Sequence, residues 1–159
     1  MDVNGFKGPN SEARNGKQYD IRSFKVAKFS KGCAGVEVPN IGCVYQLPSY
    51  SPIKAGSDEM DKWDPNWKNS GYSSYDNYWA GAKKACDDIG MSLPDESKLK
   101  SLAKKTTAEK EQLGLPTSGK FWSSSEQGLY SAYKIFFDDG ATGIDVKYAE
   151  LNKVLCVGD

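Results

Sequence analysis

The sequence predicts an α+β domain, because segments with helical periodicity come before a series of segments typical of β-strands. Helical spacing is clearest at 78–89, where apolar residues recur at Trp79, Ala82, Cys86 and Ile89. Four candidate strands follow, at 120–126, 131–137, 142–148 and 153–158. The third observation is the cysteine count, since four cysteines in a chain of 159 residues favour a fold held by disulfides.

The N-terminal third of the chain carries weaker structural signals. Residues 1–18 contain turn dipeptides in series, and residues 19–29 have enough β-branched and aromatic residues for one or two strands. Residues 30–56 hold a short cysteine loop and several prolines, which favours irregular structure with short strands. We therefore expect an N-terminal β or irregular extension over 1–56 and a second part over 57–159, joined in one compact unit.

Two helices are expected in the middle of the chain, after a long polar segment rich in aromatic residues at 57–76. Asp76 or Asn77 is the N-cap of the first helix and Gly90 is its stop signal. Asp95 caps the second helix. The inner face of the second helix is expected to consist of Leu99, Leu102 and Ala103.

The remainder of the chain is predicted as a surface connection followed by an antiparallel meander. Residues 106–120 are charged and are interpreted as the connection. The four candidate strands come next, and Asp138 to Gly140 form a turn signal between two of them.

The cysteines are expected to form two disulfides rather than a zinc site. The chain has no histidine, and its cysteines lack the short spacing of zinc ligands. One short and one long separation favour Cys33–Cys43 and Cys86–Cys156 among the three connectivities that four cysteines allow. The long bond would hold the first helix to the last strand. Disulfides imply an oxidising compartment, and a cytosolic protein with four free thiols is the alternative.

Charge and hydropathy limit the partners of the chain. The 21 basic and 21 acidic residues cancel, so no net field attracts nucleic acid or an acidic membrane. No apolar run of transmembrane length occurs, and the opening MDVNGFKGPN has neither the basic nor the apolar region of an export signal. Since disulfides require export, we expect the sequence to be a trimmed part of an exported protein.

The C-terminal part resembles the second half of the C-type-lectin fold. The similarity covers residues 75–159 and rests on A-x-x-A-C-x-x-x-G-M-S-L-P, on FWSSSE, on SAYKIFFDDG and on VLCVGD. In that fold a helix cysteine pairs with one in the final strand. The resemblance implies two helices packed on an antiparallel sheet, as in the lectin-like domains of bacterial surface proteins. The calcium-binding tripeptide and the Trp-Asn-Asp sequence of sugar-binding members have no counterpart here, so their calcium-dependent sugar site is not carried over.

The N-terminal part is similar to type IV pilin-like, or prepilin-type, proteins of gut bacteria. The similarity rests on DVNGFKGPN, GKQYDIRSFKV, YWAGAKKAC and the closing CVGD. It implies a non-enzymatic extracellular or cell-surface domain of a pilin-like or pseudopilin protein that acts in pilus structure, adhesion or ligand display. A missing N-terminal helix would be its only membrane element, and other pilin subunits or a host or cell-surface glycan or protein would be its partners. A free-standing secreted module that binds glycan or protein is the alternative.

Aromatic residues in polar surroundings are the candidate binding surface. Tyrosine and tryptophan bury a large area and keep one polar contact, which suits both glycan stacking and protein recognition. The alternative is an aromatic-rich β core, and Tyr133 is assigned to the core because it shares strand parity with Ile135 and Phe137. The expected ligand-binding residues are Trp63, Trp67, Tyr72, Tyr75, Glu126, Tyr130 and Tyr148.

Metal binding and catalysis have less support in the sequence. Asp2 and Asn4 could offer hard oxygen ligands to calcium, alone or with Asn10 or Asp20, although the same residues suit a pair of turns. A second acidic cluster, also interpreted as a solvated loop, consists of Asp58, Glu59, Asp61 and Asp64. Without histidine, a nucleophile elbow or a phosphate-binding glycine loop, we expect no enzymatic activity.

Overall fold

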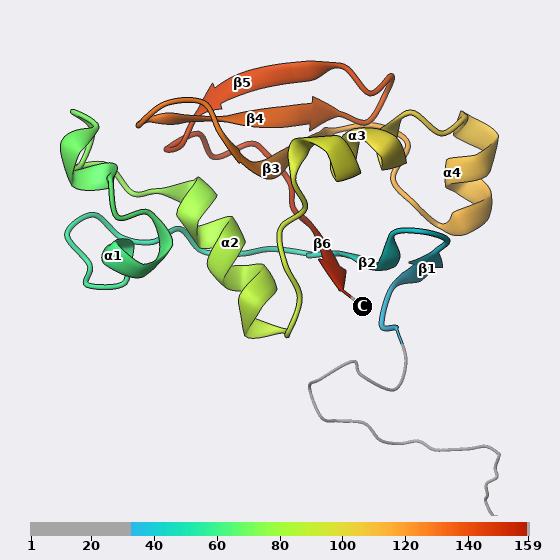
Figure 1. Cartoon of the computed structure of the whole chain (residues 1–159), viewed down its shortest axis with the longest axis horizontal. Coiled ribbons are helices and arrows are strands. Elements are labelled where there is room, and N and C mark those ends of the chain that lie inside the picture. The colour runs from blue at the N-terminus through green and yellow to red at the C-terminus, as the bar shows by residue number, and fades with distance from the viewer. Residues whose placement is uncertain (1–32, 159) are drawn as a thin grey trace, which may run out of the picture. The chain divides into compact units, whose positions relative to one another are not determined.

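A computed structural model describes residues 33–158, and the following account concerns these residues, which form one compact unit (Figure 1). The expected strand at 19–29 lies outside the described residues, and the boundary expected at 56/57 falls inside this unit. The strands are β1 (Val36–Val38), β2 (Gly42–Gln46), β3 (Lys120–Glu126), β4 (Ser131–Phe136), β5 (Thr142–Val146) and β6 (Leu155–Gly158). The helices are α1 (Met60–Trp63), the 3₁₀ turn η1 (Trp67–Asn69), α2 (Tyr78–Asp88), α3 (Glu96–Ala103) and α4 (Thr107–Leu113).

The strands form two antiparallel sheets, which confirms the α+β class. One sheet has the order β3-β4-β5 and the other has the order β1-β2-β6. The expected four-stranded meander is wrong for its last strand. β6 does not join β3, β4 and β5 but pairs with β2, where Val157 lies opposite Val44. Both residues are buried, so this pairing covers an apolar strand that would otherwise have an open edge.

The ends of α2 and α3 follow from their capping residues. Asn77 is the N-cap of α2 and its side chain accepts a hydrogen bond from the Ala80 backbone N–H at 2.8 Å. Asp95 caps α3 in the same way, through the Lys98 N–H. Gly90 follows α2 with a φ of 75°, a conformation that glycine adopts without strain. Both helices therefore begin where the sequence predicts.

Two segments expected to be irregular are helical. Residues 107–113, part of the expected surface connection, form α4, whose N-terminus has a capping box between Thr106 and Glu109. Within the expected loop at 57–76, α1 and η1 are short helical turns that carry Met60 and Trp67 into the core. These elements are too short for apolar periodicity to reveal them, but packing of their buried side chains stabilises them.

Both expected disulfides are present. Cys33–Cys43 closes a short loop that contains β1 and ends in β2, and Cys86–Cys156 joins α2 to β6 across 70 residues of sequence. Among the described residues no cysteine is free. The long bond fixes the first long helix to the sheet that contains the N-terminal strands.

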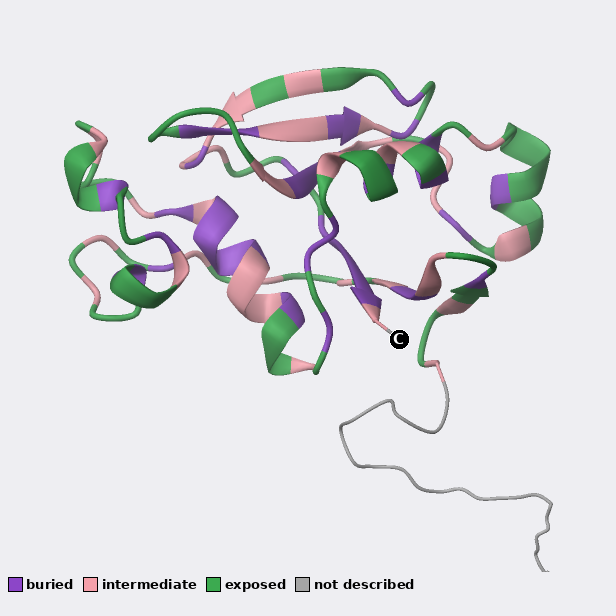
Figure 2. Cartoon of the chain, viewed as in Figure 1, coloured by how far each residue is buried: buried purple, intermediate pink, exposed green. Residues whose placement is uncertain are grey.

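The main core lies where α3 packs against β3 and β4 and where these elements meet the β1-β2-β6 sheet (Figure 2). The inner face of α3 is buried as expected. A second, smaller cluster lies beside α1 and the start of α2, and its buried members are Ile53, Met60, Trp67 and Ala80. This second cluster lies under the segments that carry most of the candidate binding residues.

Candidate ligand-binding site

Four of the expected binding residues form one cluster of tyrosine rings, which we call the tyrosine face: Tyr72, Tyr75, Tyr130 and Tyr148. The ring centroids of Tyr75 and Tyr148 are 4.6 Å apart, and Tyr72 lies 5.0 Å from Tyr130 and 5.4 Å from Tyr148. Tyr75 is 49% exposed and Tyr130 is 43% exposed, while the other two rings are half-buried. The three segments that supply these rings are distant in sequence, so the fold creates the cluster.

The segment before α2 holds Tyr72 and Tyr75 in a fixed turn. The Tyr75 backbone N–H donates to the Tyr72 carbonyl at 3.0 Å, and the Tyr72 N–H donates to the Ser70 hydroxyl at 3.0 Å. Asp76 anchors the end of the turn by accepting a hydrogen bond from the Ala55 N–H and pairing with Lys54. These bonds hold the pKa of the Asp76 carboxyl below its usual value, with the Ala55 bond as the main cause.

Lys147 connects the other two tyrosines of the face. Its backbone N–H donates to the Tyr130 carbonyl at 2.9 Å, and its carbonyl accepts from the Tyr78 N–H at 2.7 Å. Tyr148 is the next residue in the chain. The backbone of Lys147 therefore fixes the β3–β4 hairpin, the start of α2 and Tyr148 relative to one another.

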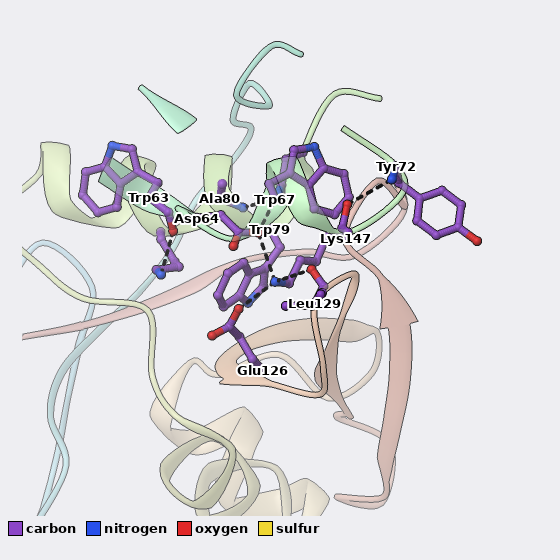
Figure 3. A network of polar contacts seen from close by, with 12 residues as sticks. Trp63, Asp64, Trp67, Tyr72, Trp79, Ala80, Glu126, Leu129 and Lys147 are labelled. Carbon is purple, nitrogen blue, oxygen red and sulfur yellow. Dashed lines mark hydrogen bonds and ion pairs between the residues drawn. The ribbon is translucent and has the colours of Figure 1, made fainter. Parts of the chain in front are cut away.

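The side chain of Lys147 lies at the centre of a buried polar network beneath the face (Figure 3). It is 0% exposed, and its ammonium contacts Asp64 Oδ2 at 3.0 Å and Glu126 Oε2 at 2.7 Å. It also donates to the Leu129 carbonyl at 3.1 Å and lies 4.4 Å from the centre of the Trp79 ring. Three acceptors thus match the three protons of the ammonium group.

Asp64 and Trp79 are held in turn by neighbouring groups. The Asn77 side-chain amide donates to Asp64 Oδ2 at 2.9 Å, so the residue that caps α2 also orients the carboxylate. The Trp79 indole N–H donates to the Ser123 carbonyl of β3 at 2.7 Å. The Lys83 ammonium lies 4.3 Å from the centre of the same ring and donates to the Trp63 carbonyl. Burial lowers the pKa of Lys83. The Lys147 charge lowers it further, whereas the nearby Glu126 and Asp64 carboxylates oppose the shift.

The two tryptophans of the predicted set do not join the tyrosine face, and the prediction is corrected at Trp67. Trp67 is 1% exposed and packs in the smaller core cluster, because its indole N–H finds a partner in the Tyr75 carbonyl at 3.2 Å. It supports the face from beneath. Trp63 is half-buried and lies on the other side of the network from Tyr72 in Figure 3.

Glu126 and Tyr133 take different positions from the face tyrosines. Glu126 is exposed at the end of β3, but its carboxylate is bound to Lys147. Tyr133, which was assigned to the core, is half-buried on β4, opposite the exposed Ile144 of β5.

The tyrosine face carries no net charge of its own at neutral pH. Burial raises the pKa of the Tyr148 hydroxyl, and the neighbouring Tyr72, Tyr75 and Tyr130 raise it further. The neighbouring tyrosines are therefore close enough to influence the Tyr148 hydroxyl, and each tyrosine hydroxyl can donate and accept a hydrogen bond. The arrangement offers aromatic rings for stacking together with tyrosine hydroxyls for hydrogen bonding.

Sequence reasoning missed the residues that position the face, above all Lys147 and the role of Asp64. Lys147 follows a half-exposed strand and Asp64 stands in an acidic segment, so both have the pattern of solvated side chains. Asn77 was recognisable from the sequence as a candidate helix cap. A cap assignment does not reveal that its side-chain amide also donates to Asp64.

No metal site can be added to this description. The candidate calcium ligands Asp2 and Asn4, with Asn10 and Asp20, lie outside the described residues. Between residues 33 and 158 no group of three or more acidic or cysteine side chains is placed to hold a metal ion. In the second acidic cluster, Asp64 points away from its neighbours to bind Lys147. None of the helices between residues 33 and 158 has the length and apolar character of a membrane-spanning segment.

The comparison with known families covers most of this site. Residues 71–158 match a family described as a domain of unknown function (DUF8780). The chain belongs to this family. All four face tyrosines, Lys147 and the Cys86–Cys156 bond lie within the DUF8780 segment, whereas Asp64 and the Cys33–Cys43 bond precede it. No curated protein matches the chain.

Proposed function

We propose that the chain is a non-enzymatic extracellular domain of a type IV pilin-like or pseudopilin surface protein, with a C-type-lectin-like fold, and that it acts in adhesion by binding glycan on its tyrosine face. The observation that carries this proposal is the convergence of four tyrosine rings from three segments on an exposed surface. Tyr75 and Tyr130 contact the half-buried rings of Tyr148 and Tyr72 but remain 49% and 43% exposed, which favours a role in recognition.

The chemistry of the face favours a sugar as the ligand. Pyranose rings present apolar C–H faces that stack on aromatic rings, and their hydroxyls can form hydrogen bonds with tyrosine hydroxyls. The face itself consists of tyrosine side chains without a formal charge, and the Glu126 carboxylate is bound to Lys147 at 2.7 Å. A neutral glycan therefore fits this surface better than a strongly charged partner.

The covalent framework supports export and the lectin-like assignment. A disulfide between the first long helix and the last strand is the bond that the resemblance implies, and Cys86–Cys156 has this position. Two disulfides in 126 described residues (33–158) are typical of proteins in an oxidising compartment.

Glycan-array binding of the purified, oxidised chain tests the proposal. We expect neutral glycans to bind, and we expect Tyr75→Ala and Tyr130→Ala each to weaken binding by about tenfold, because each removes one stacking ring. Tyr75→Phe keeps the ring and should retain more binding than Tyr75→Ala.

The matched control is Ile144→Ala, which removes an exposed apolar side chain (52% exposed) that makes no ring contact with the face. It should bind as the unchanged chain does. Absence of glycan binding, or equal loss in Ile144→Ala and Tyr75→Ala, would contradict the proposal, and binding to a protein partner instead would replace glycan by protein as the ligand.

A further inference from the structure

The buried network beneath the tyrosine face brings one lysine against two carboxylates in different environments. Lys147 and Asp64 side chains are 0% and 1% exposed, whereas the Glu126 side chain is 44% exposed. Glu126 can thus exchange protons with solvent while it contacts Lys147, and Asp64 cannot. A buried ion pair lacks the hydration that stabilises its two charges. Conversion into an uncharged product is therefore more favourable in free energy here than for the same pair at the surface.

We propose that Lys147 and Asp64 react to form an intramolecular isopeptide bond, with Glu126 as the catalytic acid and base. The proposal does not rest on the ligand suggested above, although the bond would leave Glu126 without the Lys147 charge. The Lys147 Nζ is 3.0 Å from Asp64 Oδ2. The carbon that Nζ would attack, Asp64 Cγ, is bonded directly to this oxygen. The Glu126 carboxylate, at 2.7 Å from Nζ, is within proton-transfer distance.

The reaction needs no co-reactant. Glu126 takes one proton from the Lys147 ammonium and passes it to the Asp64 carboxylate, and the nitrogen lone pair then attacks Cγ to form the C–N bond. The tetrahedral nitrogen loses a second proton to Glu126, which gives it to the departing hydroxyl. The C–O bond breaks, water leaves, and the third proton stays on the amide. An ammonium and a carboxylate thus become an amide and one water, with no change of oxidation state.

The surroundings favour reaction over exchange with solvent. The Trp79 ring is 1% exposed and lies 4.4 Å from Nζ, where it excludes water from one side of the pair. Two groups held in contact have an effective molarity of the order of 10⁵ M or more. This offsets the free-energy cost that amide formation has between separate molecules in water.

The bond would join the residue after α1 to the residue after β5, which are 83 positions apart. These two segments are held only by non-covalent contacts in the described chain, since the disulfides join other elements. A covalent tie here would secure the base of the tyrosine face and, unlike a disulfide, would survive reducing conditions.

The test is the intact mass of the purified, folded chain after reduction of its disulfides. We expect a mass lower than the sequence mass by one water, and a protease digest in which the peptide containing Asp64 is joined to the peptide containing Lys147. An unchanged mass in the wild-type chain would overturn the proposal outright.

Two variants and an internal control assign the roles. Lys147→Arg should have the full sequence mass. Glu126→Gln should retain the fold and both disulfides yet also keep the full mass, and loss of water in this variant would overturn the assignment of Glu126. The control pair is Lys134–Asp145, an ion pair at 3.1 Å with side chains 14% and 25% exposed, which should yield separate peptides because it is more hydrated and contacts no second carboxylate in the described chain.

Discussion

Tyr50 shows at the residue scale how one hydroxyl joins separate parts of the chain. It accepts a hydrogen bond from the Trp122 indole N–H at 3.1 Å and donates to the Asn152 carbonyl at 3.4 Å. Burial raises the pKa of this hydroxyl from 10.0 to about 12, against the opposing effect of the Trp122 bond. The neutral phenol is therefore the form that the folded chain requires.

This shift predicts a loss of stability in alkali. Because the folded-state pKa of Tyr50 lies above the unfolded value, its contribution is fully present below about pH 10 and disappears as the pH rises to about 12. We expect a decrease of the order of 2 kcal/mol in unfolding free energy from this group. Denaturant unfolding of the chain and of Tyr50→Phe across this range should show a smaller decrease in the variant, and parallel curves would contradict the assignment.

Individual residues were the least predictable part of the candidate site. The sequence placed the four face tyrosines among the expected binding residues, because aromatic residues in polar segments are typical of binding surfaces, and the structure brings their rings together. It did not separate them from Trp67, since exposure depends on whether a short turn folds inward, and η1 does. Lys147 was missed for a related reason, because its burial depends on Asp64 and Glu126, which are distant in sequence.

At the scale of the element, α4 is stabilised at its N-terminus by reciprocal hydrogen bonds. The Thr106 hydroxyl accepts from the Glu109 N–H at 3.1 Å, and the Thr106 N–H donates to the Glu109 carboxylate at 3.0 Å. The buried Lys110 side chain then docks the helix by donating to the carbonyls of Ala103 and Phe137. These contacts link α4 to the end of α3 and to the residue after β4.

The cap predicts a measurable change in stability. Thr106→Ala should lower the unfolding free energy by about 1 kcal/mol, because it leaves a first-turn N–H without its side-chain acceptor. The exposed neighbour Thr107 is outside the cap, so Thr107→Ala is the control. Chemical denaturation at neutral pH measures both, and equal effects would show that the cap contributes little.

Glu109 gives the same cap a pH dependence. The hydrogen bonds from the Thr106 backbone and side chain hold the pKa of the Glu109 carboxyl below its usual 4.5. Its contribution is therefore present above about pH 4.5 and lost as the pH falls through the lowered folded-state value. The stability difference between the chain and Glu109→Gln should shrink over this acidic range.

Elements with strong local signals were predicted, and those that depend on distant partners were not. Asn77 and Asp95 mark the starts of α2 and α3 because a cap acts within one turn. The segment 153–158 was correctly identified as a strand, but its partner β2 could not be read from local sequence because pairing depends on which sheet has an open apolar edge. The capping box of α4 was present in the sequence and could have revealed that helix.

For the whole molecule, the two disulfides have unequal effects because they close loops of different length. Cys86–Cys156 spans 70 positions and Cys33–Cys43 spans 10. Loop-closure entropy in the unfolded chain predicts about 4 kcal/mol for the long bond and about 3 kcal/mol for the short one. The long bond also connects α2, which starts beside the polar network, to β6 of the β1-β2-β6 sheet.

Paired substitutions test this difference. The double variant Cys86→Ala with Cys156→Ala should lose more unfolding free energy than Cys33→Ala with Cys43→Ala, both measured by denaturation against the oxidised chain. Since Cys86 and Cys156 are fully buried, their loss also leaves space in the core, which increases the difference in the same direction. A larger loss in the Cys33–Cys43 variant would mean that the short loop stabilises β1 and β2 beyond its entropy, and that the link from helix to terminal strand is not the main covalent support of the fold.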